Sequence, residues 1–485
     1  MSDPIRDHSC FNHSGLGSIA SHVIALFFSL SLCKTHTPIV GVHGSYITMM
    51  QVRAYIISTS SEALAMACTI AVRYSAVRRQ GYAADAAAKR ADNAPHECQV
   101  LDYRQQQYRL LPLLAASYAI FFTGKHVLAR LKDIEHRLVS GAASITKTVV
   151  GDIHATTSAL KSYATTLTAD GIEDCRKACG GHGYLVASGL VELCNTYLQS
   201  CTVEGDNQML PQQVVKVLLK LVGALQTGDE AAIREYEATD MFYLMGPLRT
   251  LMQNGGDVPT RSAFAFPADA SAEHFADVPT LLQAFAHRAA CLLLDVALEL
   301  QSAMADGRTQ QRAWNDALLA MKRASEAHAA YLLLRDFADG LAAERRRSPA
   351  DASSLGPREV EALSKCLVLL GLYWMERDLR DFLQVRCLPA SAVPPLRRAL
   401  RDALAGLRPA AVGLCDARDF ADFRLKSALG RYDGDVYPAI LAAARRDPLN
   451  ATGPDASLRR LVAGGAGAFR PGGAGRGPAG TMARL

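Results

Sequence analysis

The sequence predicts an all-α protein built from two helical bundles. Of its 485 residues, 49% are hydrophobic and 20% are charged, which is the balance of a globular chain with a buried core. Alanine and leucine dominate, aromatic residues make up only 7%, and the apolar–polar alternation typical of strands is scarce. These observations exclude a fibrous or wholly disordered chain and favour helix almost throughout.

Charge balance and cysteine content exclude several kinds of partner. The chain has 52 Lys and Arg against 47 Asp and Glu, and a formal net charge of +5 predicts no nucleic-acid partner. Its 12 cysteines include no close Cys-x-x-Cys pair of the zinc-binding type, so we expect neither a disulfide scaffold nor a metal site. A reducing compartment fits this pattern better than secretion does.

Residues 1–44 are predicted to be a leader without a clear helix or strand, either disordered or foreign to the native protein. Its most apolar run, 19–33, is too short to span a membrane and carries a histidine and three serines. The residues before that run mix Asp3, Arg6 and Asp7, whereas a secretory signal begins with a purely basic segment. We therefore expect no membrane span and no secretion.

A first helical domain is expected over 45–252. The stretch 52–80 is rich in alanine and lacks proline and glycine, which predicts one long helix with a basic last turn. Further helices are expected over 105–122, 129–167 and 173–179, with breaks at Gly171 and at Gly180-Gly181. Another helix begins near Pro211, where apolar residues recur at helical spacing on one face.

The best domain boundary is the segment 253–279, which is rich in glycine, proline and small polar residues. A second helical domain is expected over 280–462. Short polar or proline-containing links divide it into helices over 281–304, 308–345, 357–385 and 390–407. Residues 463–485 are so rich in glycine that we expect a flexible tail.

Two polar segments of the first domain could bind an anionic ligand. Arg78, which follows a long apolar helix, could clamp a pyrophosphate because its guanidinium matches phosphate oxygens; the alternative is a basic turn that offsets the helix dipole. The sequence CGGHGY at 179–184 is a glycine-rich turn whose backbone a ligand could approach closely, or else a plain helix stop. Within it, His182 fits a turn residue better than a metal ligand or a base.

Glu204 is the candidate for acid–base chemistry. It lies in a loop next to Gly205, between two apolar segments, and a carboxylate that is removed from water there could act as a general base. The structural alternative is helix capping, for which Asp206 and Asn207 are better suited than Glu204.

Several separated strings, in the same order, resemble the C-terminal half of peroxisomal acyl-CoA oxidases. These strings are AVRYSAVRRQ at 71–80, VLDYRQQQYR at 100–109, CRKACGGHGY at 175–184, EGDN at 204–207, LRPAAV at 407–412, LGRYDGDVY at 429–437 and DPLN at 447–450. The resemblance extends from about residue 44 to about residue 462, and it implies two helical-bundle domains like the C-terminal domains of that family.

The resemblance implies a flavoprotein that oxidises fatty acyl-CoA. In this family a glutamate removes the α-proton, the β-hydrogen leaves as a hydride to FAD, and O2 reoxidises the flavin to give H2O2. Glu204 takes the position of that base, and Arg78 resembles the residue that meets the FAD pyrophosphate. Gln107 is placed like a flavin-contacting glutamine, and Gly180-Gly181 resembles the loop that lies against the FAD of the facing subunit of a homodimer. We therefore expect Glu204 in a shared cleft lined by the 180–183 turn.

The ending Ala483-Arg484-Leu485 resembles the small–basic–leucine address read by the peroxisomal import receptor. Together with the family resemblance, it predicts a peroxisomal location.

The sequence also departs from the family. The helical N-terminal domain and the β-domain of the family have no counterpart in this chain. Gly81 stands where the family usually has Phe, and Val203 where it usually has Tyr. The alternative to an oxidase is therefore a catalytically inactive helical fragment that serves as a dimerisation or binding module.

Overall fold

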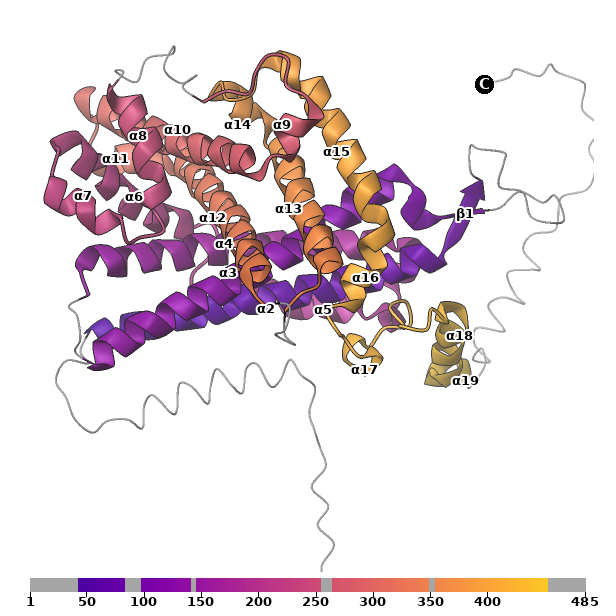
Figure 1. Cartoon of the computed structure of the whole chain (residues 1–485). Coiled ribbons are helices and arrows are strands. Elements are labelled where there is room, and N and C mark those ends of the chain that lie inside the picture. Colours follow the sequence, from indigo (N-terminus) through magenta and orange to yellow (C-terminus); the bar gives the residue numbers. More distant parts are fainter. Residues whose placement is uncertain (1–41, 83–96, 141–144, 254–263, 349–353, 452–485) are drawn as a thin grey trace, which may run out of the picture. The chain divides into compact units, whose positions relative to one another are not determined.

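The computed structural model describes residues 42–82, 97–140, 145–253, 264–348 and 354–451. It confirms the all-α prediction (Figure 1). The α-helices are α2 (Val42–Val77), α3 (Arg104–Ser140), α4 (Lys147–Ala178), α5 (Leu190–Tyr197), α6 (Leu210–Thr227), α7 (Glu230–Tyr236), α8 (Phe242–Gln253), α9 (Ala272–Ala276), α10 (Val278–Ala305), α11 (Gln310–Asp316), α12 (Leu318–Arg346), α13 (Pro357–Arg377), α14 (Leu379–Gln384), α15 (Val393–Leu407), α16 (Ala411–Asp416), α17 (Asp422–Leu425), α18 (Val436–Arg446) and α19 (Pro448–Ala451).

Short 3₁₀ helices connect several of these elements: η1 (Val100–Asp102), η2 (Gly180–Tyr184), η3 (Val186–Ser188), η4 (Leu198–Cys201), η6 (Ala390–Ala392) and η7 (Arg408–Ala410). In the described residues, the strands β1 (Arg79–Tyr82) and β2 (Glu97–Gln99) form one antiparallel pair. The predicted tail, 463–485, lies outside the described residues, and so does the predicted leader except for its last three residues, which begin α2.

The first long helix differs from its prediction at both ends. α2 begins ten residues earlier than the predicted start at 52 and ends at Val77, so its last turn carries no basic residue. Arg78 lies just beyond the helix, and Arg79 starts the strand β1, where it is paired with Gln99. The two arginines therefore belong to a helix–strand junction directly after the C-terminus of α2.

Two predicted helix breaks are wrong because the glycines serve close packing. Gly171 lies inside α4, where an added Cβ would come within 2.7 Å of Leu64 Cδ1, and the predicted helix over 173–179 is the end of α4. Likewise, α3 continues through the predicted gap at 123–128, and a Cβ on its Gly124 would lie 3.1 Å from the Ser58 Cα. At both positions a missing side chain lets α2 approach its neighbour.

The later helices follow the prediction closely. α10 and α15 coincide with the expected helices to within three residues, whereas each of the other two is divided by a short break, into α11 with α12 and α13 with α14. Pro357 starts α13 and Pro211 lies in the first turn of α6, where a missing backbone N–H is not needed.

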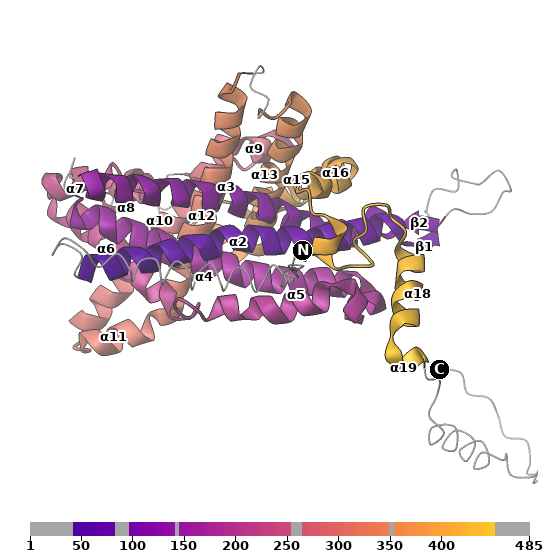
Figure 2. The same ribbon diagram turned by 90° about the horizontal axis from the view of Figure 1, so that it is seen from below.

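The helices on both sides of the predicted boundary pack together. α2 lies along α3 and α4, and α12 contacts α3, α4 and α6 (Figure 2). Contacts group the chain up to Gly434 into one compact unit, and the residues from Asp435 onward, with α18 and α19, into a second. The division at 253–279 stays a prediction from sequence, and part of that segment lies outside the described residues.

A buried charge cluster joins α3, α4 and α12 within the larger unit. Arg130 donates to Asp152 at 2.9 Å and is also paired with Asp240. Arg335 donates to Asp240 at 2.9 Å and to Asp336 at 2.6 Å. Burial raises the pKa of Asp152, and the Arg130 guanidinium opposes this shift. We call these five residues the charge cluster.

Three described helices are long and apolar enough to cross a membrane by length and composition. They cover Ile47–Val77, Arg104–Arg137 and Val278–Ala305, and between 61% and 83% of their most apolar windows is buried inside the protein. Their apolar faces therefore pack largely on other helices, as in a globular core.

Candidate active site

Glu204 lies in a tight turn between η4 and α6. Its φ of 58° and the φ of 110° at Gly205 place both residues in the left-handed region. The side chain is partly exposed, and its neighbours Val203 and Met209 leave 43% and 41% of their surface open to solvent. Among the described residues, the Glu204 carboxylate accepts no hydrogen bond and forms no ion pair.

The structure shows which polar residues of this loop form hydrogen bonds that stabilise it. The side chain of Asp206 accepts a hydrogen bond from the backbone N–H of Gln208 at 2.8 Å, and its carbonyl accepts from Leu210. Asn207 is buried and its amide binds Thr165 and Thr166 of α4. Asp206 and Asn207 thus stabilise the turn, and Glu204 has no structural bond of this kind.

Two buried cations lie beneath the turn. Arg53 of α2 donates from Nε to the Glu204 carbonyl at 2.9 Å, and Lys161 of α4 donates from Nζ to the Gly205 carbonyl at 2.7 Å. Arg53 also donates to Ser158 at 2.9 Å and lies 3.5 Å from His154 Nδ1. Burial, with the Arg53 charge as a second cause, lowers the pKa of His154 to about 4.

The sequence singled out neither Arg53 nor Lys161. The sequence feature that could have indicated them is a single basic residue within an apolar helical stretch. The long aliphatic side chain of such a residue usually lets its charged group reach solvent, so the feature does not predict a buried cation. Arg53 is only 5% exposed and Lys161 is fully buried.

The predicted anion-binding residues meet at one end of the helices. The backbone carbonyl of Arg78 accepts from the N–H of Val100, and this bond joins the end of α2 to the start of η1. The side chain of Gln106 donates to Ser75 of α2 at 3.0 Å and to the Ala178 carbonyl at the end of α4 at 2.9 Å. Arg78 and the Gly180 turn therefore lie at the same end of this bundle.

The glycine-rich turn presents an open backbone. Gly180 has a φ of 61°, and both Gly180 and Gly181 are exposed with no atom within 4 Å of where a Cβ would be. Gly183 is different, because a Cβ there would collide with the Arg176 carbonyl at 2.0 Å. His182 hydrogen bonds through Nδ1 to the Tyr74 hydroxyl at 2.7 Å, as expected of a turn residue.

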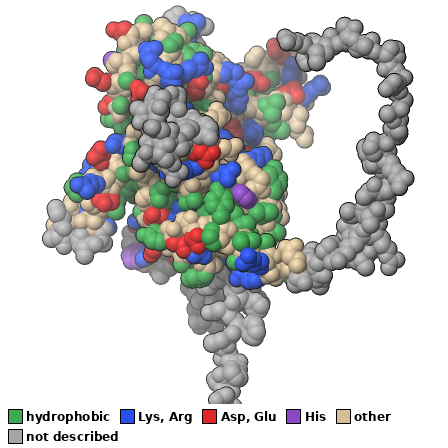
Figure 3. Space-filling model, turned by 90° about the vertical axis from the view of Figure 1, so that its right-hand side faces the viewer, with side chains coloured by type: hydrophobic (Ala, Val, Ile, Leu, Met, Phe, Trp, Pro, Cys, Tyr) green, Lys and Arg blue, Asp and Glu red, His purple; other side chains and the backbone are tan. Residues whose placement is uncertain are grey.

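The face of the molecule at this end is shown in Figure 3, where hydrophobic side chains gather next to Lys and Arg. The residues after the Gly180 turn are apolar or aromatic and exposed: Tyr184, Leu185 and Val186 are all open to solvent. Arg176 stacks over the Tyr184 ring at 4.2 Å from its centroid, so a cation borders this apolar surface.

Gln107 is not open to a ligand in this structure. Only 2% of the residue is exposed. Its Nε2 donates to the Leu101 carbonyl at 3.1 Å, and its Oε1 accepts from Arg104 at 2.6 Å. These bonds hold the connection between η1 and α3, and a flavin contact would require them to exchange.

Glu204 and the Gly180 turn do not meet within one chain. The Glu204 turn contacts α4 at Lys161, Thr165 and Thr166, whereas Gly180 follows the end of α4 at Ala178. The twelve helical steps from Thr166 to Ala178 span roughly 18 Å. Within one chain, the described residues therefore place Glu204 and the Gly180 turn apart, and the cleft shared between subunits stays a prediction.

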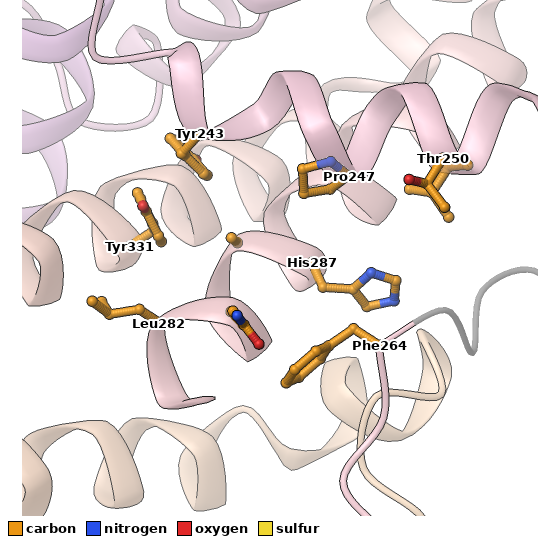
Figure 4. Close-up of a pocket in the computed structure, with 10 residues that line it drawn as sticks. Tyr243, Pro247, Thr250, Phe264, Leu282, His287 and Tyr331 are labelled. Carbon is orange, nitrogen blue, oxygen red and sulfur yellow. The ribbon is translucent and has the colours of Figure 1, made fainter. Parts of the chain in front are cut away.

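The described residues also form two cavities of about 390 Å³ that contain none of the predicted site residues. One lies between α8, α10 and α12, where Tyr243, Tyr331 and His287 come together (Figure 4). The other, between α9, α13 and α15, is lined mainly by apolar and small side chains. No group of three or more potential metal ligands occurs among the residues that the structure describes.

Two family models match the chain. The model described as acyl-CoA oxidase, C-alpha1 domain, matches residues 46–219, and the model described as acyl-CoA oxidase matches residues 277–463. The chain belongs to the acyl-CoA oxidase family. The first match contains Arg78, Gln107, Gly180, Gly181 and Glu204.

Curated acyl-CoA oxidases are similar over the same part of the chain. Peroxisomal acyl-coenzyme A oxidase 1 of Mus musculus is 33% identical over 418 residues, covering 84% of this chain and 56% of that protein. The protein of the same name from Arabidopsis thaliana is 36% identical over 406 residues, covering 84% of this chain and 54% of that protein. The chain therefore spans about half the length of these acyl-CoA oxidases.

Solved acyl-CoA oxidase structures share the fold. Arabidopsis thaliana acyl-CoA oxidase 1 matches with a TM-score of 0.75 and 33% identity, over 88% of this chain and 59% of that one. Acyl-CoA oxidase-2 of Caenorhabditis elegans, solved with FAD, ascaroside-CoA and ATP, matches with a TM-score of 0.72 and 27% identity, over 88% of this chain and 57% of that one.

Proposed function

We propose that this chain acts in an acyl-CoA oxidase reaction, in which a fatty acyl-CoA is oxidised to the trans-2-enoyl-CoA and O2 is reduced to H2O2. The observation that carries the proposal is the Glu204 turn. It presents a carboxylate without an ion pair among the described residues, beside open apolar side chains, within the region that matches the C-alpha1 family model.

Glu204 has the role of the base. Its carboxylate takes the α-proton of the thioester, and the apolar Val203 and Met209 beside it favour the fatty acyl chain over water. A thioester α-proton is weakly acidic, so the enolate oxygen that forms needs hydrogen-bond donors as the proton leaves.

The residues at the other end of α4 fit FAD. FAD supplies the acceptor for the β-hydride and, once reduced, reacts with O2. Gly180 and Gly181 leave their backbone open, as close approach of a dinucleotide requires. Arg78, at the same end of the helices, is the residue whose guanidinium would meet the pyrophosphate. Gln107 stays a predicted flavin contact, since its amide is engaged in this structure.

A homodimer would unite the two halves of the site. Glu204 and the Gly180 turn are roughly 18 Å or more apart along α4, so the two do not line one small pocket within a chain. With the Gly180 turn facing the FAD of a second subunit, each site would take Glu204 from one chain and the turn from the other.

The proposed location is the peroxisome. The curated relatives are named peroxisomal. The C-terminal tripeptide Ala483-Arg484-Leu485, which lies outside the described residues, would be read by the import receptor.

The test compares Glu204→Gln with Asp206→Asn in the purified chain supplied with FAD and a fatty acyl-CoA. Loss of the base should reduce peroxide formation by about 10²- to 10⁴-fold, because Gln cannot accept the α-proton. Asp206→Asn changes a neighbouring carboxylate whose partner among the described residues is the Gln208 N–H, which an amide oxygen can also accept, so its turnover should stay within a few-fold of the parent.

The alternative function is a helical binding module without turnover. The observation that favours it is the predicted flavin contact Gln107, which is buried and whose amide is bonded to Leu101 and Arg104. A chain that stays colourless with added FAD and makes no peroxide from acyl-CoA, while remaining folded and dimeric, would support this alternative.

A further inference from the structure

The turn that carries Glu204 is held from below by two cations from two different helices. Arg53 and Lys161 each donate to a backbone carbonyl, and the two carbonyls belong to the consecutive residues Glu204 and Gly205. Both carbonyl groups are thus bonded to side chains on the protein side of the turn.

The cation from α4 has an unusual environment. Lys161 is fully buried, and among the described residues it forms no ion pair; its acceptors are the neutral oxygens of Gly205 and Asn207, at 2.7 and 2.9 Å. Burial lowers the pKa of Lys161 to about 8. A buried ammonium group without a carboxylate costs folding stability, and residues that break such a rule concentrate at functional sites.

The backbone that these cations hold is itself strained. Glu204 is a non-glycine residue in the left-handed region, with a φ of 58°, and such a conformation is sterically unfavourable. A side chain at position 205 would clash with the neighbouring helix, because a Cβ on Gly205 would lie 2.7 Å from Leu210 Cδ2. Strain of this kind persists only where the surroundings fix the conformation, and the two charged hydrogen bonds do so here.

Asn207 extends this attachment along α4. Its side chain accepts from Lys161 and donates to Thr165 and Thr166, while its carbonyl accepts from Ser162 at 2.9 Å. The turn is therefore bonded to α4 over more than one helical turn, and Arg53 adds a bond from α2 on the other side.

We propose that Arg53 and Lys161 are positioning residues for Glu204. By bonding the carbonyls of Glu204 and Gly205, they fix the left-handed backbone from which the Glu204 side chain projects, and so fix the direction of its carboxylate. This inference rests on the proposed function of Glu204 as the base, and neither cation is assigned a contact with substrate or cofactor.

The first experiment measures hydrogen exchange at the turn in the full chain and does not depend on turnover. The amides of Asn207, Met209 and Leu210 report the turn, because the first donates to the Cys201 carbonyl at the end of η4 and the other two donate to the Asp206 carbonyl. In Lys161→Met, their protection should fall by at least 10-fold, while protection in α3 stays unchanged. Lys216→Met, which removes an exposed lysine of α6, is the matched control and should leave the turn unchanged.

The second experiment separates kcat from KM in the peroxide assay. Lys161→Met and Arg53→Met should lower kcat by about 10-fold or more with KM within about 3-fold, because a misdirected base slows proton removal more than binding. Arg53→Lys keeps a charged donor below the Glu204 carbonyl and should recover part of the lost kcat. A purely structural role would not give this recovery at equal thermal stability.

The outcomes distinguish this inference from the proposed function. Unchanged protection of the turn in Lys161→Met overturns the inference, whatever the activity. Loss of protection with full kcat overturns it as well, provided that Glu204→Gln is inactive. If the parent chain makes no peroxide, the proposed function fails, and the exchange measurement alone decides whether the two cations hold the turn.

Discussion

Among single residues, His328 shows how burial controls a titration. It is 1% exposed on α12 and its Nδ1 lies 2.8 Å from the Tyr243 hydroxyl. Its Nε2 has no partner among the described residues. Burial, with the Arg335 charge as a second cause, lowers the pKa of His328 to about 3. The folded protein therefore holds this imidazole neutral over a pH range in which the unfolded chain protonates it.

This predicts a loss of stability in acid. Between pH 6.5 and about 3 the unfolded state binds the proton and the folded state does not, so the free energy of unfolding falls as the pH falls. The contribution of His328 should reach about 2 kcal/mol at pH 5. Urea unfolding at a series of pH values should show that His328→Gln has a shallower acid slope than the parent. Equal slopes in the two proteins would contradict the assigned protonation state.

At the scale of helices, a glycine can mark either a helix end or a close crossing of two helices, and the sequence alone does not distinguish the two roles. Gly180 lies at a real helix end and has a positive φ, whereas Gly171 lies within α4 and lets Leu64 and Leu113 come close. A helix stop depends on neighbours in sequence, but a close crossing depends on residues from α2 and α3 that lie far away along the chain. The predicted break at Gly171 was wrong for this reason.

A pair of alanine substitutions tests the packing role of Gly171. The new methyl group of Gly171→Ala would meet Leu64 at 2.7 Å, which should destabilise the protein by about 1–3 kcal/mol despite the better helix propensity of alanine. Gly223 of α6 has open space around its Cα, so Gly223→Ala should stabilise by up to about 1 kcal/mol. Denaturant midpoints measure both changes, and equal shifts would contradict the crossing geometry.

Local patterns predicted most helices but only part of the site. The apolar face of α6 was readable because Val214, Leu218 and Leu221 recur at helical spacing, and all three are buried. The Glu204 turn could be predicted from the sequence, because a glycine follows an acidic residue that caps no helix. The role of Arg53 could not be predicted from the sequence, because the carbonyl that it binds lies 151 residues further along the chain.

For the whole molecule, the charge cluster crosses the predicted domain boundary. Arg335 of the second helical segment pairs with Asp240 of the first, and Arg130 of α3 joins the same group. The buried carboxylates depend on these arginines for their charge compensation. The helices up to Gly434 should therefore unfold together.

Arg335→Met tests this coupling. Removing the guanidinium leaves Asp240 and Asp336 with less compensation and should cost about 3–5 kcal/mol. Arg308→Met removes the exposed pair with Asp316 and should change stability by less than about 1 kcal/mol. In circular dichroism melts, the helical signal of the parent should be lost in one transition. Two separate transitions in the parent would instead support independent helical domains.

The length of α4 between Lys161 and Ala178 has a genetic consequence. If each active site of a dimer takes Glu204 from one chain and the Gly180 turn from the other, two alleles with different inactivating substitutions can complement each other. Suppose that Glu204→Gln chains are mixed with Gly181→Phe chains. In each dimer that contains one chain of each kind, one active site would then hold both substitutions and the other active site would hold neither. Random association at equal amounts should restore about a quarter of parental turnover. Mixtures as inactive as their components would mean that each polypeptide builds its centre alone.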